Sequence, residues 1–127
     1  MIAVDTSALM AIALNEPKGA ECLAVLKAEA SVVISAGTLA EALIVAEGRG
    51  LGAEMGRLVD DLNFEVAALT AASARRVAEA HKSWGRGFHK AALNYGDCFA
   101  YAVAKERGCR LLYVGKDFSK TDIKSAL

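Results

Sequence analysis

Short apolar runs alternate along the chain with longer stretches in which apolar residues recur at helical spacing. The apolar runs predict four buried strands, at residues 2–4, 31–34, 64–67 and 110–114. The longer stretches predict helices at residues 7–14, 18–29, 38–47, 53–61, 71–82 and 95–107. Because strands alternate with helices, we expect an α/β domain whose parallel sheet is covered by helices on both faces.

The length and composition fit a single domain. The chain has 127 residues, of which 54% are hydrophobic, enough for one domain over residues 1–127. Fifteen Lys and Arg residues balance fifteen Asp and Glu residues, so any nucleic-acid-binding surface must be local. The N-terminus lacks the features of a signal peptide, and no apolar run approaches the roughly 18 residues of a membrane span. We therefore expect a soluble cytoplasmic protein with no membrane association.

Acidic residues stand where the predicted strands end. Asp5 directly follows the first strand, Glu41 lies in the first turn of the helix after the second, and Asp117 follows the last strand. Asp97 opens the helix that leads into the last strand. Because ligands bind beyond the carboxyl ends of parallel strands, which share one edge of the sheet, we expect the first three of these acids to meet there. Asp97 joins them if its helix starts at the same edge.

Acids that converge in this way need a charge partner. Two carboxylates about 5 Å apart repel each other by roughly 3 kcal/mol at an effective dielectric constant near 20. A cation between them removes this cost, and oxygen ligands without Cys or His suit Mg²⁺ or Mn²⁺. Such a site can support metal-assisted hydrolysis of a phosphodiester. The alternative is that one acid is protonated, which would give an acid–base pair.

Each acid also has a purely structural explanation. Asp5, Asp97 and Asp117 could cap helices or turns by accepting backbone N–H groups. Glu41 lies three residues after Thr38, which is the spacing of a capping box at the start of a helix. Taken together these explanations weaken, because three of the acids fall at the same end of separate strands.

Four segments of the chain carry a resemblance to a known family. They are, in order, MIAVDTSAL, SAGTLAEALIVAE, LNYGDCFAYAVA and LLYVGKDFSKTDI. In order, spacing and local sequence they resemble the motifs of PIN-domain ribonucleases, especially the VapC-type toxins of bacterial toxin–antitoxin pairs. The resemblance implies a three-layer α/β/α sandwich with a central parallel sheet. It also implies Mg²⁺- or Mn²⁺-dependent cleavage of RNA, neutralisation by a cognate antitoxin, and a homodimer.

The resemblance assigns roles to individual residues. The family's first three acids match Asp5, Glu41 and Asp97, which would be catalytic and would hold the metal. Thr6 matches the hydroxyl residue beside the first acid, which often supports the site.

The fourth acid of the family is its most variable, and it matches Asp117. Many relatives have an acid or Asn where this chain has Lys116. This departure leaves two alternatives open: Asp117 lies outside the ligand shell, or Asp122 replaces it.

A basic segment precedes the helix that Asp97 opens. Residues 75–90 hold five Lys and Arg residues against one Glu, a net charge of +4, together with Trp84 and Phe88. Basic side chains bind phosphates and aromatic rings stack on unpaired bases, so we expect Arg86 and Lys90 to contact RNA. The alternative is a solvated helix face followed by a flexible loop, with Trp84 packed on the domain.

The two helices after the second predicted strand carry more apolar residues than a small sheet needs to cover. These residues are Leu43, Ile44, Leu51, Met55, Leu58, Val59 and Leu62. In the family that the chain resembles, this helical pair forms part of a groove that binds an antitoxin helix. The alternatives are an intramolecular core or a homodimer face.

Three other functions compete with a metal-dependent ribonuclease. A catalytically inactive PIN-like module would bind RNA or a protein, but such a module has no need to keep a cluster of like charges. A histidine-based ribonuclease would use His81 and His89 as acid and base, but neither has an orienting acid at an obvious spacing. A phospho-acceptor receiver domain needs paired acids beside the first strand, where this chain offers only Asp5.

Overall fold

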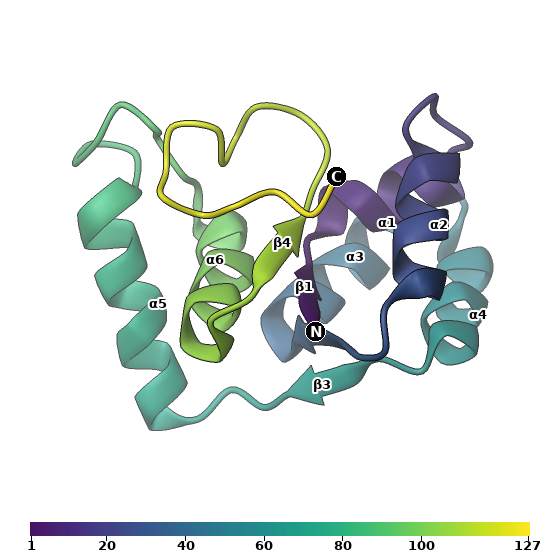
Figure 1. The fold of residues 1–127 in the computed structure, drawn as a ribbon, viewed down its shortest axis with the longest axis horizontal. Coiled ribbons are helices and arrows are strands. Elements are labelled where there is room, and N and C mark those ends of the chain that lie inside the picture. Colours follow the sequence, from purple (N-terminus) through teal and green to yellow (C-terminus); the bar gives the residue numbers. More distant parts are fainter.

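Four parallel strands form the centre of the molecule, whose computed structural model describes residues 1–127. The strands are β1 (Ile2–Val4), β2 (Val32–Ser35), β3 (Glu65–Ala67) and β4 (Arg110–Leu112), in the spatial order β3-β2-β1-β4. Every pairing is parallel. The carboxyl ends of the strands therefore share one edge of the sheet, toward which β1 and β4 point in Figure 1.

Six helices cover the two faces of the sheet. They are α1 (Thr6–Ala13), α2 (Gly19–Ala28), α3 (Ala36–Gly48), α4 (Gly52–Leu62), α5 (Ala71–Trp84) and α6 (Tyr95–Arg107). In Figure 1, α5 and α6 lie on the left of the sheet and the other helices lie on the right and behind it. None of the helices has both the length and the apolar character needed to cross a membrane. The expected three-layer α/β/α sandwich is confirmed.

Each face of the sheet has its own apolar core. The first core, under α1 to α4, takes five strand residues: Ile2, Val4, Val32, Ile34 and Leu112. The second core, under α5 and α6, takes Ala3, Val33 and Leu111. Because successive strand residues point to opposite faces and both faces are covered, the strands appear in the sequence as continuous apolar runs.

The predicted elements agree with the observed ones to within two residues at every end. Helix α3 begins two residues early because Ser35 caps it, with its Oγ accepting the Gly37 N–H at 3.2 Å. Thr38 consequently lies inside the helix, so the capping box proposed for Thr38 and Glu41 is wrong. Strand β4 ends at Leu112, and the Val114 N–H instead donates to Ser7 Oγ at 3.0 Å.

The apolar residues of α3 and α4 divide into two groups. Met55 is fully buried, and Leu51, Leu58, Val59 and Leu62 pack against the first core. For this group the intramolecular alternative is confirmed. Leu43 and Ile44 of α3 remain exposed, and 71% of Ile44 is accessible to solvent.

Replacing Met55 by Ala should destabilise the fold far more than replacing Ile44. A buried Met→Ala change removes apolar contacts and leaves a cavity, which costs about 2–5 kcal/mol. Ile44→Ala should change the free energy of unfolding by about 0.5 kcal/mol or less, because the side chain is already in water. Chemical denaturation of both variants checks this, and equal losses would contradict the packing of α4.

Candidate active site

Asp5 links the end of β1 to the start of α1. It is the N-cap of α1, and its Oδ2 accepts both the backbone N–H of Ser7 at 3.0 Å and the Ser7 hydroxyl at 2.6 Å. The capping role proposed for Asp5 is therefore present. Its other oxygen, Oδ1, has no hydrogen bond within the chain, although the residue is buried. A capping role thus occupies only half of this carboxylate.

Glu41 lies two residues further into α3 than predicted, in its second turn, and faces the same edge. Its Oε1 accepts the hydroxyl of Thr6 at 2.6 Å, so Thr6 contacts a second acid besides its neighbour Asp5 in the chain. Helix α6 packs closely against it, since a Cβ atom on Gly96 would lie 2.1 Å from Glu41 Oε2. A side chain at position 96 would therefore displace the Glu41 carboxylate from its position beside Thr6.

Asp97 lies in the first turn of α6, but it is not the N-cap. Asn94 caps the helix by accepting the Asp97 N–H at 2.9 Å, and Asp97 Oδ2 accepts the Asn94 N–H at 3.0 Å. This reciprocal pair is a capping box. As in the other two acids, one oxygen of Asp97 is engaged and the other is free.

The two candidates for a fourth acid lie in different surroundings. Asp117 is exposed on the loop after β4, and its charge acts on Asp97. Asp122 accepts the Tyr101 hydroxyl at 2.6 Å and forms an ion pair with Lys105 at 3.0 Å. These donors hold the pKa of the Asp122 carboxyl below its usual range. The geometry therefore favours Asp117 over Asp122 as the fourth member of the acidic cluster.

The cluster carries negative charge that no cation balances. Burial raises the pKa of Asp97 to about 6, and repulsion from Asp5, Asp117 and Glu41 adds to this rise. Burial also raises the pKa of Asp5, against the lowering effect of its hydrogen bonds from Ser7. None of the ion pairs in the molecule includes one of these four acids.

The donor set fits a hard divalent cation that keeps much of its water. Asp5, Glu41 and Asp97 each present one free carboxylate oxygen. No three His, Cys, Asp or Glu side chains are placed to hold one metal ion together. Mg²⁺ commonly binds through one or two carboxylates and retains several waters, so Asp5, Glu41 and Asp97 would hold it directly or through its waters.

Comparisons with known proteins agree with this geometry. A sequence model of the PIN domain matches residues 2–124. Ribonuclease VapC30 of Mycobacterium tuberculosis is 37% identical over 124 residues, which span 94% of this chain and 94% of that protein. Ribonuclease VapC36 of the same organism is 42% identical over 125 residues, spanning 95% of this chain and 90% of that protein. The chain belongs to the VapC ribonucleases of the PIN-domain family.

Solved structures confirm the PIN fold. The crystal structure of Mycobacterium tuberculosis VapC20, described as a sarcin–ricin loop cleaving toxin, superposes with a TM-score of 0.78 at 17% identity. The superposition covers 97% of this chain and 96% of the VapC20 chain. A toxin–antitoxin complex from Klebsiella pneumoniae gives a TM-score of 0.69 at 18% identity, covering 96% and 93% of the two chains. At these identities the likeness shows the fold alone.

Sequence reasoning missed three residues that shape the site of this VapC-family chain. Ser7 joins Asp5 to Val114, and Asn94 orients Asp97. Gly96 lets α6 approach Glu41. The capping-box spacing of Asn94 and Asp97 could have revealed Asn94. The other two residues depend on contacts between distant parts of the chain.

The basic segment of this PIN domain ends in a loop next to the acids. Arg86 and Lys90 are exposed on the loop between α5 and α6, which leads directly into the turn that carries Asp97. Phe88 is 66% exposed, whereas Trp84 packs on the domain and donates from Nε1 to the Tyr101 hydroxyl at 2.8 Å. Of the two aromatic residues, only Phe88 is free to stack on a base.

Proposed function

We propose that this chain is the toxin of a toxin–antitoxin pair and hydrolyses RNA phosphodiester bonds with Mg²⁺ or Mn²⁺. The observation that carries the proposal is the cluster of Asp5, Glu41, Asp97 and Asp117, which has no cation partner, at the carboxyl edge of a VapC-family fold. A divalent ion bound there lowers the pKa of water and balances negative charge that develops on the phosphate.

The chain's own residues hold the ligands in fixed directions. Asp5, Glu41 and Asp97 are the proposed ligands. Ser7 orients Asp5, Thr6 orients Glu41 and Asn94 orients Asp97, each through a hydrogen bond to one carboxylate oxygen. Such outer contacts tune both the position and the affinity of a metal ligand. Asp117 adds negative charge at the exposed side of the cluster and is the proposed fourth acid.

The cluster argues against a module that only binds RNA. Unpaired carboxylates repel phosphates, so a binding surface without a cation would lose affinity by keeping them. They also oppose folding, because burial and mutual repulsion raise the pKa of Asp97 to about 6. A bound cation reverses both effects.

Cleavage of total cellular RNA by the purified, antitoxin-free chain tests this function. We expect discrete fragments with Mg²⁺ or Mn²⁺ and none with EDTA or with Asp5→Asn. Asp61→Asn, the same change at an exposed acid in the last turn of α4, should cut like the wild type. If a folded chain supplied with metal cuts no class of RNA, the inactive binding module becomes the better description.

An antitoxin and a second copy of the chain are the proposed protein partners. Leu43, Ile44 and Val45 are exposed on α3, the helix that also carries Glu41. An antitoxin helix that covers these residues could place a basic side chain, such as Arg, against the acids and exclude the metal. The expectations of a homodimer and of a cytoplasmic location stay predictions.

A further inference from the structure

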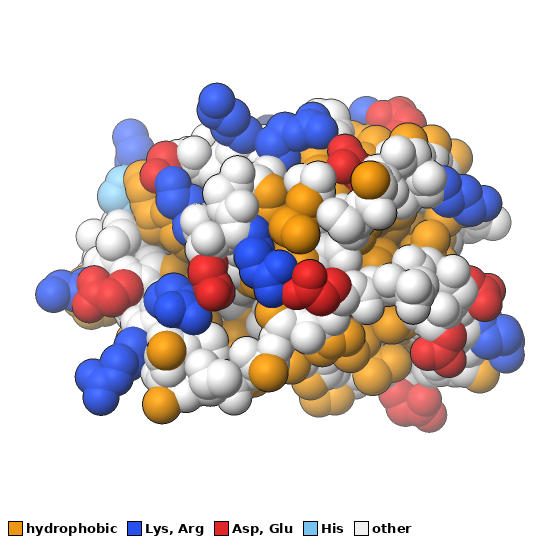
Figure 2. All heavy atoms as spheres, turned by 60° about the horizontal axis from the view of Figure 1, so that its bottom comes forward, with side chains coloured by type: hydrophobic (Ala, Val, Ile, Leu, Met, Phe, Trp, Pro, Cys, Tyr) orange, Lys and Arg blue, Asp and Glu red, His pale blue; other side chains and the backbone are white.

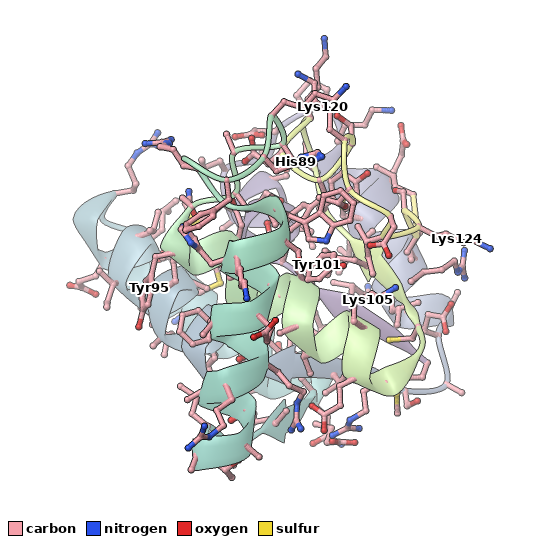
Figure 3. The ribbon with its side chains drawn as sticks, turned by 90° about the vertical axis from the view of Figure 1, so that its left-hand side faces the viewer. His89, Tyr95, Tyr101, Lys105, Lys120 and Lys124 are labelled. Carbon is pink, nitrogen blue, oxygen red and sulfur yellow. The ribbon has the colours of Figure 1, made fainter.

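Two basic segments lie at the end of the molecule that carries the acids. One is the helix-linking loop, residues 85–93, and the other is the C-terminal segment, residues 113–127, which follows β4. Figure 1 shows both at the end toward which β4 points, and Figure 3 places His89 of the first segment and Lys120 of the second at that same end. The acid Asp117 belongs to the C-terminal segment itself.

The cations of these two segments form no ion pairs within the chain. Of the fifteen Lys and Arg residues, six form ion pairs, which are Lys18, Arg57, Arg76, Lys105, Arg107 and Arg110. At the amino end of the sheet, which Figure 2 turns toward the viewer, Lys and Arg side chains lie next to Asp and Glu side chains. Arg86, Lys90, Lys116 and Lys120 have no such partner.

The C-terminal segment has a defined shape. Phe118 is buried in the second core and packs on Tyr113 with ring centroids 5.0 Å apart. Lys116 and Lys120 are exposed on either side of it. The end of the segment is held along β4, where the Leu111 N–H donates to Lys124 O and the Ala126 N–H donates to Leu111 O, both at 2.9 Å. The two lysines are therefore presented on an anchored turn.

The helix-linking loop is closed at its base. The Arg86 N–H donates to Leu93 O and the Leu93 N–H donates to Trp84 O, both at 3.0 Å. The ring of His89 packs edge-on against Trp84 with centroids 4.7 Å apart. Arg86 and Lys90 thus project from a loop whose shape is also fixed.

A hydrogen-bond chain beneath the surface joins Trp84, the last residue of α5 at the base of the helix-linking loop, to the C-terminal segment. Trp84 Nε1 donates to the Tyr101 hydroxyl at 2.8 Å, and that hydroxyl donates to Asp122 Oδ1 at 2.6 Å. Tyr101 is buried on α6, between the helix-linking loop and the C-terminal segment, as Figure 3 shows. The chain of three residues ties the position of one segment to that of the other.

We propose that the helix-linking loop and the C-terminal segment are the two walls of one RNA-binding surface. In the second wall, the C-terminal segment, Lys116 and Lys120 contact backbone phosphates of the RNA strand that Arg86 and Lys90 of the first wall also bind. In the same proposal, Trp84, Tyr101 and Asp122 are positioning residues that keep the two walls in register with the acids. The inference rests on the proposed ribonuclease function and adds a binding surface to it. It also gives Asp122 a role other than metal ligation.

Binding of a fluorescent single-stranded RNA, measured by anisotropy in Mg²⁺, tests the wall itself. Every chain carries Asp97→Asn so that the RNA stays intact. Lys116→Ala with Lys120→Ala should raise Kd about tenfold and reduce the slope of log Kd against log salt by about 1.4, at roughly 0.7 for each single-strand phosphate contact. Lys27→Ala with Arg49→Ala is the matched control, since both cations are exposed at the ends of α2 and α3 that lie away from the acids.

The control should leave Kd and the salt slope unchanged. Equal losses in both double variants would indicate a general charge effect and would overturn the wall. An unchanged Kd in the Lys116 and Lys120 variant, or no RNA binding by any chain, would overturn it as well. The cleavage assay on the wild type reports separately on the ribonuclease function, because it does not depend on which lysines bind.

Three further variants test the positioning chain. Tyr101→Phe and Asp122→Ala break the hydrogen bonds and should raise Kd three- to tenfold with the salt slope of the wild type. Asp122→Asn keeps an acceptor for the Tyr101 hydroxyl and should restore Kd. A Kd that is equal in all three variants would remove the positioning role. Loss of metal-dependent cleavage in Asp122→Asn, made in the otherwise wild-type chain, would make Asp122 a metal ligand instead.

Discussion

Asp97→Asn should leave less than about 1% of the metal-dependent RNA cleavage and yet raise the melting temperature of the metal-free chain at pH 7.5. Loss of a residue that only orients a metal ligand typically costs 10- to 100-fold, so loss of a ligand should cost at least about 100-fold. The expected gain in stability comes from removing the buried negative charge of Asp97. Burial and three neighbouring carboxylates raise the pKa of Asp97 to about 6, so its ionised form opposes folding at pH 7.5.

The side-chain amide of the Asp97→Asn variant keeps the hydrogen bond of the capping box and lacks the negative charge. Asn at position 97 can still accept the Asn94 N–H through its side-chain oxygen, which preserves the capping box without the charge. After allowance for solvent screening at this half-buried site, we expect a gain of about 1–2 kcal/mol. Thermal melts in EDTA measure it, with Asp61→Asn as a control that should not shift. A lower melting temperature in Asp97→Asn would contradict the account of the cluster.

The sequence was sufficient to place the acids because their positions follow from topology. Asp5 follows the first strand and Glu41 lies early in the helix after the second strand, so a parallel sheet brings them to one edge whatever the details of packing. Asp97 was harder to place, because α6 had to start at that same edge. It does so because α6 runs back to the amino end before β4 begins.

Hydrogen-bond partners could not be predicted in the same way. The spacing of Thr38 and Glu41 suggested a local capping box, but Ser35 caps the helix and starts it earlier. Glu41 instead accepts a hydrogen bond from the hydroxyl of Thr6, 35 residues away in the chain. A spacing rule describes neighbours within one helix. It carries no information about a residue on another element that lies within hydrogen-bond distance only after folding.

The choice between Asp117 and Asp122 shows the same limit. Both lie in the polar segment after β4, and the sequence offers no reason to turn one toward the acids and the other away. The structure separates them through Tyr101, whose hydroxyl needs an acceptor where it is buried on α6 and finds Asp122. Packing of an aromatic residue thus decides which carboxylate remains available to the site.

Without metal, the chain should lose stability as the pH rises from about 4.5 to 6.5, and a divalent ion should abolish this loss. In the native state Asp97 binds its proton up to about pH 6, whereas an unfolded Asp releases it near its ordinary pKa of 3.8. Between these values the native state binds more protons, so the free energy of unfolding falls with pH. Burial raises the pKa of Asp5 as well, and its contribution has the same sign.

Denaturant titrations across this pH range, in EDTA and in Mg²⁺, measure the effect. Groups with a lowered native pKa, such as Glu65 beside Arg107, contribute stability that is lost only as the pH falls below the ordinary Glu pKa of 4.5. These groups therefore do not hide the expected loss of stability between about pH 4.5 and 6.5. Asp97→Asn should flatten the profile in EDTA, and the difference between the two wild-type profiles should widen toward pH 7 because the ion binds the ionised carboxylates. Stability that rises with pH in EDTA would mean that burial and the neighbouring carboxylates do not raise the pKa of Asp97, and the argument for a cation would lose its physical basis.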